Sequence, residues 1–177
     1  MGLRGYKVRM LTRCALLAAL HCVCGWISVS IGDTVFTMQT FAVFLTLFLM
    51  GGKWGTATVL VYLLLGAVGL PVFSGFRGGV GMLFGATGGY LMGFVVTGLT
   101  CWAVEAVLGS RFAVTAMIFG LLGCYAYGTV WYLTFYAERS AFGPVLVKCV
   151  IPFVIPDALK MVLAYRVSRR IKGFRTV

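Results

Sequence analysis

An aspartate and a lysine stand three residues apart in an apolar segment near the C-terminal end of the sequence. Asp157 and Lys160 lie in IPFVIPDALKMVLAYRV, so on a helix they share one face. Pro152 and Pro156 suit the first turn of that helix, which places Asp157 at the positive end of the helix dipole. Each charge costs on the order of 3 kcal/mol at bilayer depth. The pair is therefore either an ion pair that ties the helix to its neighbours or a polar patch in a ligand pocket.

Four other polar side chains are candidates for ligand contact. Gln39, in FTMQTFAVF, offers an amide donor and an acceptor, which suit either an interhelical hydrogen bond or a ligand. Arg77 is flanked by a glycine-rich loop, where it either clamps a carboxylate or faces water. Ser74 and Tyr90 place hydroxyl groups near the same loop, and an ordinary structural role is open to each.

The loop belongs to a glycine-rich stretch, GLPVFSGFRGGVGMLFGATGGYLMGF, at residues 69–94. Gly81, Gly85, Gly89 and Gly93 recur at every fourth position, so a helix through them presents a bare stripe to another backbone. The residues before the stripe do not favour a regular helix. Irregular backbone at membrane depth survives only where protein buries it or where it lines a cavity. The stretch therefore predicts a pocket covered by a loop.

The sequence is poorly equipped for catalysis. It has four acidic residues and one histidine, and it contains neither an H-E-x-x-H motif nor a Ser/His/Asp set. The segment at residues 51–54, GGKW, lacks the leading glycine and the Ser/Thr of a phosphate-binding loop. None of the six cysteines forms a C-x-x-C pair, which favours small apolar residues over metal ligands. We expect no enzyme activity and no metal site.

The composition is that of a membrane protein. Hydrophobic residues make up 61% of the 177 residues and charged residues 11%, and the mean hydropathy is +1.01. A soluble domain has roughly 25% charged residues. The net charge of +11 comes mostly from clusters at the two ends of the chain. That distribution follows the positive-inside rule and does not indicate nucleic-acid binding.

The elements that must position these residues are apolar helices. A membrane-spanning helix needs about 20 apolar residues. We predict an all-α integral membrane protein, a single domain over residues 1–177 with both termini cytoplasmic. Gly32–Thr34, the loop Leu70–Gly81 and Ala137–Ile151 then lie on the outer side. The six predicted helices cover about 8–31, 36–50, 53–69, 82–108, 112–136 and 152–171.

Ala15 and Ala19 form an A-x-x-x-A step on the first predicted helix. Small residues four apart let two helices approach closely. From the spacing alone, packing within the molecule is the simpler interpretation.

Several blocks of the sequence resemble the BioY family, the biotin-specific substrate-capture subunits of energy-coupling-factor transporters. These blocks are GLPVFSGFRGGVG at 69–81 and LFGATGGYLMGF at 83–94. FTMQTFAVF at 36–44 and PDALK at 156–160 match two further family blocks in the same order. The resemblance spans nearly the whole chain. One departure is Ala86, where the family usually has proline before T-G-G-Y.

The resemblance implies high-affinity binding of biotin near the extracellular face and its uptake into the cell. The contacts that it implies come from Gln39, Ser74, Gly75, Asp157 and Lys160, with Tyr90 on the wall and Arg77 or loop N–H groups at the valerate carboxylate. The partners that it implies are a membrane coupling protein, which docks at Ala15 and Ala19, and two cytosolic ATPases. Biotin is then the transported ligand, no cofactor is held, and the location is the plasma membrane of a bacterium.

Three alternatives stay open from the residues. The first is a related capture subunit for another vitamin, such as riboflavin or thiamine. The second is a small membrane enzyme, and the third is a structural membrane scaffold. Vitamin binding, product formation and the effect of changing Asp157 or Lys160 separate these alternatives.

Overall fold

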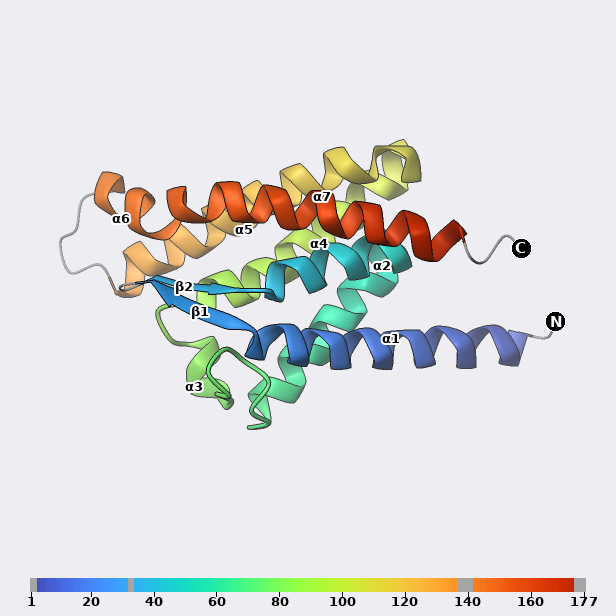
Figure 1. Ribbon diagram of the computed structural model, residues 1–177, viewed down its shortest axis with the longest axis horizontal. Coiled ribbons are helices and arrows are strands. Elements are labelled where there is room, and N and C mark those ends of the chain that lie inside the picture. The colour runs from blue at the N-terminus through green and yellow to red at the C-terminus, as the bar shows by residue number, and fades with distance from the viewer. Residues whose placement is uncertain (1–2, 32–33, 137–141, 174–177) are drawn as a thin grey trace.

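The protein is a bundle of helices with one two-stranded hairpin at one end (Figure 1). The computed structural model describes residues 3–31, 34–136 and 142–173, so parts of two predicted outer segments, residues 32–33 and 137–141, lie outside it. The elements are α1 (Leu3–Trp26), β1 (Ser28–Ile31), β2 (Thr34–Thr37), α2 (Gln39–Ala67), α3 (Val80–Leu83), α4 (Gly88–Leu108), the 3-10 turn η1 (Ser110–Phe112), α5 (Ala113–Phe135), α6 (Phe142–Cys149) and α7 (Ile151–Gly173).

Helix α2 is bent sharply at Gly51, where the sequence predicted a turn between two helices. Gly51 has φ +76°, a conformation that favours glycine. The two arms run in different directions from the bend (Figure 1). They pack closely beside it, since a Cβ on Gly55 would lie 2.7 Å from the Leu47 side chain. Glu105 of α4 holds the bend, since its Oε2 accepts a hydrogen bond of 2.6 Å from the Gly52 N–H. The bend makes α2 the centre of the bundle, in contact with α1, α4 and α7.

The predicted first helix, 8–31, begins too late and extends too far, because α1 begins at Leu3. It ends at Trp26, and the residues up to Ile31 form β1, which pairs antiparallel with β2 so that Ser28 lies opposite Thr37. The reason is local sequence. Small polar residues alternate with β-branched ones in SVSI, and TVFT is rich in β-branched and aromatic residues, both of which favour strands.

The predicted fourth helix begins too early. The chain forms the short helix α3, breaks, and starts α4 only at Gly88. A Cβ on Gly88 would lie 1.9 Å from the Leu83 carbonyl oxygen, so the break needs glycine there. Gly81 and Gly85 therefore lie outside α4, and the predicted four-glycine stripe is wrong in its first half.

The second half of the stripe forms the contact between α4 and α5. A Cβ on Gly89 would meet Trp131, and one on Gly93 would lie 2.6 Å from the Cys124 sulfur. Glycines on α5 also face α4, since a Cβ on Gly128 would meet the Tyr90 ring. Close backbone approach of this kind is how small residues join helices in membranes.

The last two long helices lie nearly where the sequence predicted, since α5 and α7 begin and end within two residues of the predicted bounds. Two details differ. The short helix α6 was not predicted as a helix, and Asp157 is the seventh residue of α7, beyond its first turn. Pro152 is in that turn, but Pro156 is inside the helix. The predicted stabilisation of Asp157 by the helix dipole therefore does not apply, because the dipole acts only within the first turn.

The outer faces of the helices are apolar. Val107, Ile155 and Leu16 are 81%, 73% and 67% exposed, whereas Tyr62 and Phe44 are fully buried in the core. Within the described residues, the stretches that are long and apolar enough to cross a membrane are Gly5–Trp26, Gln39–Ala67, Gly88–Leu108 and Ser110–Phe135. These four are fewer than the six predicted crossings, so the count of six stays a prediction.

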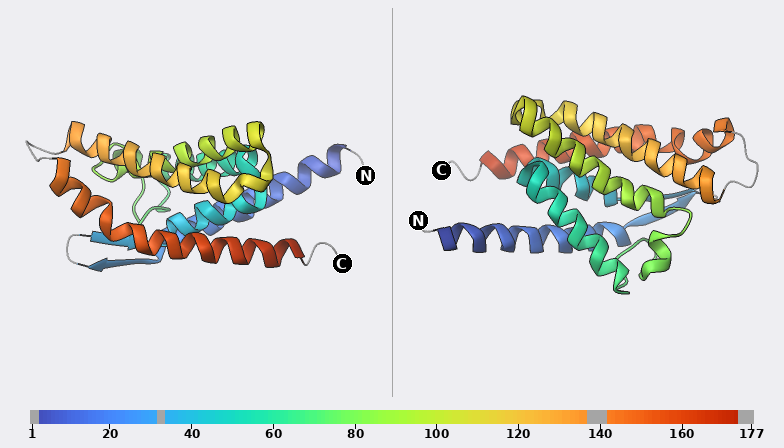
Figure 2. Two further views of the ribbon diagram at one scale, coloured as in Figure 1. Left: turned by 90° about the horizontal axis from the view of Figure 1, so that it is seen from above. Right: turned by 180° about the vertical axis from the view of Figure 1, so that it is seen from behind.

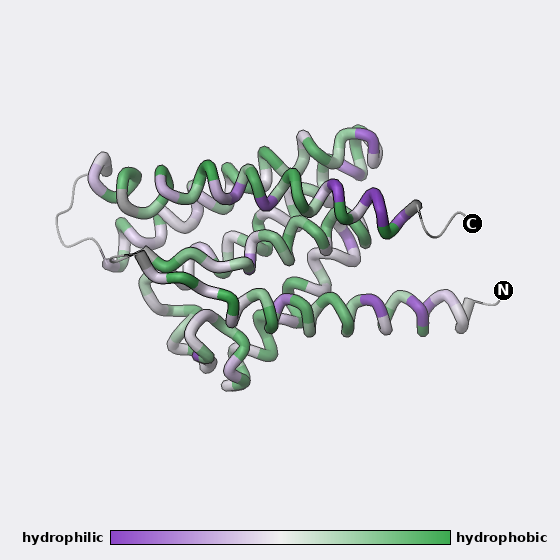
Figure 3. Tube along the Cα trace, in the orientation of Figure 1, coloured by the Kyte–Doolittle hydropathy of each residue, from purple (hydrophilic) through white to green (hydrophobic). Residues whose placement is uncertain are grey.

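The two ends of the chain lie at the same end of the molecule. Both the first turn of α1 and the last turn of α7 are found there in all three views (Figures 1 and 2). Most of the strongly hydrophilic residues gather at that end (Figure 3), and the hairpin and α6 lie at the other. The molecule therefore has one basic end and one end built of strands, loops and a short helix.

Candidate ligand-binding site

Asp157 and Lys160 lie on one face of α7, as their spacing predicted, and they form an ion pair, which is one of the two alternatives left open. Lys160 Nζ donates to Asp157 Oδ1 at 2.9 Å. The aspartate is 2% exposed and the lysine side chain 12%, so both charges are nearly out of solvent. A buried carboxylate is tolerated when it is paired and hydrogen-bonded.

Two hydroxyl groups from other helices complete the neighbourhood of Asp157. Thr40 of α2 donates from Oγ1 to Asp157 Oδ1 at 2.8 Å, and it accepts a hydrogen bond of 3.1 Å from Lys160. Tyr125 of α5 donates to Asp157 Oδ2 at 2.7 Å. Neither residue was singled out from the sequence. Two signals in the sequence could have indicated them. Thr40 directly follows the candidate Gln39, and the hydroxyl group of Tyr125, in an apolar helix, needs a hydrogen-bond partner.

These residues line a cavity of about 370 Å³ at the end of the molecule that holds the hairpin. Its apolar lining includes Val35, Phe73, Met82, Leu91, Phe94 and Phe153. Its polar lining includes Thr37, Gln39, Thr40, Ser74, Tyr90 and Tyr125. Asp157 and Lys160 are the charged side chains among the described lining residues. The cavity thus combines apolar walls with one internally neutralised pair, an arrangement typical of small-molecule sites.

Gln39 is held at the first residue of α2 and is 5% exposed. Its Nε2 donates to the Tyr62 hydroxyl at 2.6 Å, and its Oε1 accepts from Thr37 at 3.1 Å. Tyr62 in turn donates to the Val72 carbonyl oxygen at 3.2 Å. Gln39 therefore joins the two arms of α2 and, through Tyr62, the loop that follows them. It also lines the cavity, and its contact with a ligand stays a prediction.

The loop between α2 and α3 covers part of the cavity. Ser74 and Phe73 line the cavity, and the Phe73 ring packs on Tyr62. Gly75 and Arg77 are not in its lining, and Arg77 is exposed. A Cβ on Gly75 would lie 3.8 Å from Arg77 Nε, so both residues belong to the outer side of the loop. Their contact with a ligand stays a prediction, and the cavity wall does not include them.

The loop is fastened to α1 as well as to α2. The Trp26 indole N–H donates to the Pro71 carbonyl oxygen at 2.7 Å, and its ring stacks on Phe76 at 5.2 Å. Phe76 has φ +56°, an unusual conformation for an aromatic residue and one that stores strain. We call the residues from 69 to 79 the covering loop.

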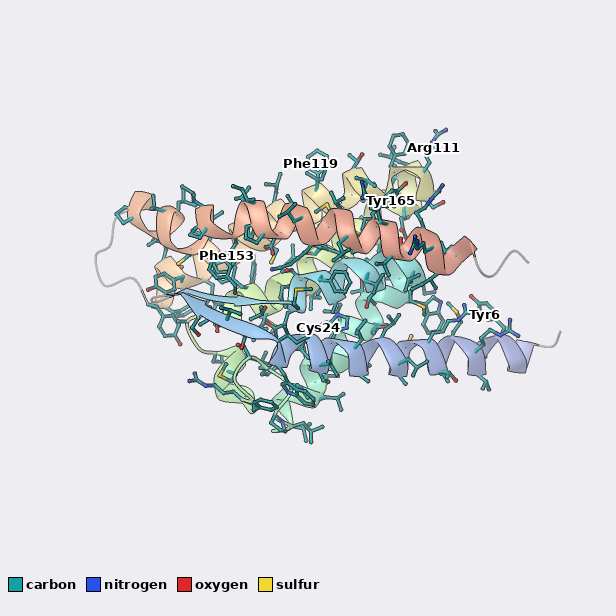
Figure 4. All side chains as sticks on the ribbon, in the orientation of Figure 1. Tyr6, Cys24, Arg111, Phe119, Phe153 and Tyr165 are labelled. Atoms are coloured by element: carbon teal, nitrogen blue, oxygen red, sulfur yellow. The ribbon has the colours of Figure 1, made fainter. Side chains whose placement is uncertain are left out.

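The remaining predicted wall residue is Tyr90 on α4, which lines the cavity and shares a hydrogen bond of 3.3 Å with Thr129. Phe153 was not predicted. It points from α7 toward β2 (Figure 4), and its ring lies 5.0 Å from that of Phe36. The hairpin also supplies part of the wall through Val35 and Thr37 of β2. The sequence missed this because it predicted helices over 8–31 and 36–50 and no strands.

Ala15 and Ala19 are exposed on α1, whereas Ala18, three residues after Ala15, is buried. They are not part of the packing inside this chain. No group of three or more His, Cys, Asp or Glu side chains suited to a metal ion occurs in the described residues.

The sequence is similar to that of known proteins along nearly its whole length. The family model described as the BioY family matches residues 2–176. The biotin transporter BioY of Thermotoga maritima is 40% identical over 169 residues, which covers 93% of this chain and 96% of that protein. The probable biotin transporter BioY of Pyrococcus horikoshii is 36% identical and covers 94% and 98% of the two chains.

The fold is also known. A crystal structure described as the S-component for biotin from an ECF-type ABC transporter matches with a TM-score of 0.85 over 98% of this chain and 95% of that one. The sequence identity is 23%, so this likeness shows the fold alone. The family match covers every described residue that lines the cavity, and the chain belongs to the BioY family.

Proposed function

We propose that this protein binds biotin in the cavity beside Asp157 and takes part in its uptake across the cell membrane. The observation that carries the proposal is the combination of the BioY family match over residues 2–176 with a cavity of about 370 Å³ that holds a buried Asp–Lys pair. Members of this family are transporters and not enzymes, and the protein is a multi-pass protein of the cell membrane.

Biotin fits the chemistry of the lining. Its ureido ring offers N–H donors and a carbonyl acceptor, which match the Asp157 carboxylate on one side and Lys160 or Gln39 on the other. Its sulfur ring suits apolar walls such as Phe73 and Phe153. Its carboxylate has no unpaired cation among the described lining residues, so we assign that end to the mouth of the cavity, within reach of Arg77 or the N–H groups of the covering loop.

Equilibrium binding of labelled biotin to the purified full chain tests this function. We expect saturable binding that unlabelled biotin displaces, and no displacement by riboflavin or thiamine. Thermal stabilisation by one of those vitamins, together with no binding of biotin, would assign the cavity to a different ligand. Formation of a chemically altered product would favour a membrane enzyme instead.

We also propose that the protein works with a membrane coupling protein and two cytosolic ATPases. The chain has no phosphate-binding motif, and the surface at Ala15 and Ala19 is exposed and built of small residues, as a helix-docking surface requires. Replacing both alanines by leucine is expected to prevent co-purification with the coupling protein and to leave biotin binding unchanged. Normal co-purification of that variant would place the interface elsewhere.

Six crossings with both termini in the cytoplasm remain our proposed topology. The common basic end of α1 and α7 supports it, because cationic residues concentrate on the cytoplasmic side. The bent α2, with arms of roughly half its length, then supplies two of the six crossings. The cavity, at the opposite end, faces outward.

A further inference from the structure

Asp157 is held from three helices at once. Lys160 lies on its own helix, α7, whereas Thr40 reaches it from α2 and Tyr125 from α5. The two hydroxyl donors are 117 and 32 residues away in the sequence. The direction of the carboxylate therefore depends on how α2 and α5 pack on α7, and not on the Asp–Lys pair alone.

The hydrogen bonds can be counted oxygen by oxygen. An ionised carboxylate offers about four acceptor positions, two on each oxygen. Oδ1 receives Thr40 and Lys160, and within the described residues Oδ2 receives Tyr125. One acceptor position is left, on Oδ2. Lys160 uses two of its three N–H groups on Thr40 and Asp157, and among the described residues the third has no acceptor, so it can meet a ligand.

We propose that Thr40 and Tyr125 are positioning residues, which fix the Asp157 carboxylate so that it presents a single acceptor to the ligand beside the Lys160 ammonium group. This inference rests on the proposed function. A side-by-side acceptor and donor match one edge of a cyclic urea, where an N–H stands next to the carbonyl. Thr40 and Tyr125 thus act on affinity through Asp157, not by their own contact with the ligand.

A double-mutant cycle separates the two roles. Tyr125→Phe removes only the hydroxyl group, and Thr40→Val replaces a hydroxyl by a methyl group. We expect each change to weaken biotin binding about tenfold or more, because each removes a hydrogen bond to a charged group. In an Asp157→Asn background the same changes are expected to weaken binding by about twofold at most, because residues that act through one group are not additive.

Matched variants control for the chemistry of each change. Thr58→Val alters a buried threonine of α2 that bonds to its own helix at Trp54, and Tyr127→Phe alters an exposed tyrosine of α5. Neither residue lines the cavity, so biotin affinity should stay within about twofold of the original. Thr40→Ser keeps the hydroxyl and should restore most of the affinity that Thr40→Val loses.

The outcomes are distinct. If the unaltered protein does not bind biotin, the proposed function fails. If it binds biotin but the effects of Tyr125→Phe and Thr40→Val persist in full in the Asp157→Asn background, both residues contact the ligand directly and the positioning role is wrong. Unchanged affinity in Tyr125→Phe, or loss of affinity in Thr40→Ser equal to that in Thr40→Val, also overturns it. Melting curves of the ligand-free variants confirm that each is folded.

Discussion

At the scale of single residues, the cavity depends on how a buried aspartate is paired and hydrogen-bonded. Asp157 is nearly inaccessible, and it is compensated by one ammonium and two hydroxyl groups. An isolated charge in such a place would be very costly, whereas a paired and hydrogen-bonded one is tolerated. The same groups that make the charge tolerable also set which of its lone pairs remains available.

Changing either member of the pair should weaken ligand binding. Asp157→Asn removes the anionic acceptor and leaves Lys160 without its counter-charge, and Lys160→Ala removes the cationic donor. We expect each change to weaken biotin binding more than about tenfold, equivalent to about 1.4 kcal/mol. Equilibrium titration with labelled biotin measures it, with Arg169→Ala, an exposed cation at the basic end of the same helix, as the control. Unchanged affinity in both site variants would favour a purely structural pair.

The sequence predicted part of this residue-scale picture. The contact of Asp157 with Lys160 followed from helix periodicity, because residues three apart on a helix are neighbours. The contacts with Thr40 and Tyr125 could not be predicted, since they form only when α2 and α5 pack on α7. Arg77 and Gly75 are a different case, because a motif suggested ligand contact and both residues lie outside the cavity lining, so that contact stays a prediction.

At the scale of elements, the covering loop links the cavity to α1. It is anchored by Trp26 at Pro71, by Tyr62 at Val72, and by the Gly79 N–H, which donates to the Gly66 carbonyl oxygen at 2.7 Å. Such loops set how quickly a ligand leaves, because they must open before it escapes. The Trp26 anchor is the one that comes from the helix bearing the proposed partner surface.

Removing the Trp26 anchor should speed ligand release. Trp26→Phe deletes the N–H that bonds to Pro71 and keeps an aromatic ring beside Phe76. One hydrogen bond is worth about 1 kcal/mol, so we expect the dissociation rate of biotin to rise about fivefold. A chase experiment with excess unlabelled biotin measures the rate, and Trp54→Phe serves as the control on α2. A rate equal to that of the unaltered protein would show that the loop opens without breaking this bond.

The bend in α2 is a second element-scale feature, and its cap comes from another helix. The Gly52 N–H is at the start of the second arm of α2, where backbone donors lack partners within the helix, and Glu105 accepts its hydrogen bond. A position for the bend was predictable from Gly51 and Gly52, because paired glycines favour a turn. The cap was not, since it joins residues 53 apart in the sequence.

Loss of that cap should destabilise the fold. Glu105→Ala leaves the buried Gly52 N–H without an acceptor, which costs about 1–3 kcal/mol of the free energy of unfolding. Glu105→Gln keeps an amide oxygen at the same place and should lose less. Thermal unfolding of both variants in one detergent compares them. Equal melting temperatures for Glu105→Ala and the unaltered protein would mean that the Gly52 N–H finds another partner.

At the scale of the whole molecule, the exposed cations and both chain termini lie at one end and the cavity lies at the other. The exposed cations Lys7, Arg9, Arg166, Arg169 and Arg170 belong to the first turns of α1 and the last turns of α7, which lie at one end of the molecule (Figure 1). The cavity is lined by the hairpin and α6, which lie at the other end. The clusters at the two ends of the sequence were enough to predict this polarity. The secondary structure of the hairpin and of the short helix α6 was not predicted, because the hydrophobic pattern assigned their segments to a helix or to a loop on the outer side.

The proposed orientation can be tested with two single-cysteine proteins. Cys149, on α6, lines the cavity, and Ser110 is exposed in the turn between α4 and α5. One protein keeps Cys149 and has the other five cysteines replaced by alanine, and the second carries Ser110→Cys with all six native cysteines replaced.

In intact cells, we expect a membrane-impermeant maleimide to label Cys149 and to label residue 110 only after the cells are permeabilised. Saturating biotin should protect Cys149, because ligand in the cavity blocks access to the sulfur, and should not affect residue 110. If residue 110 is labelled in intact cells and Cys149 only after permeabilisation, the proposed topology is inverted. If biotin does not reduce the labelling of Cys149, the ligand does not bind in this cavity.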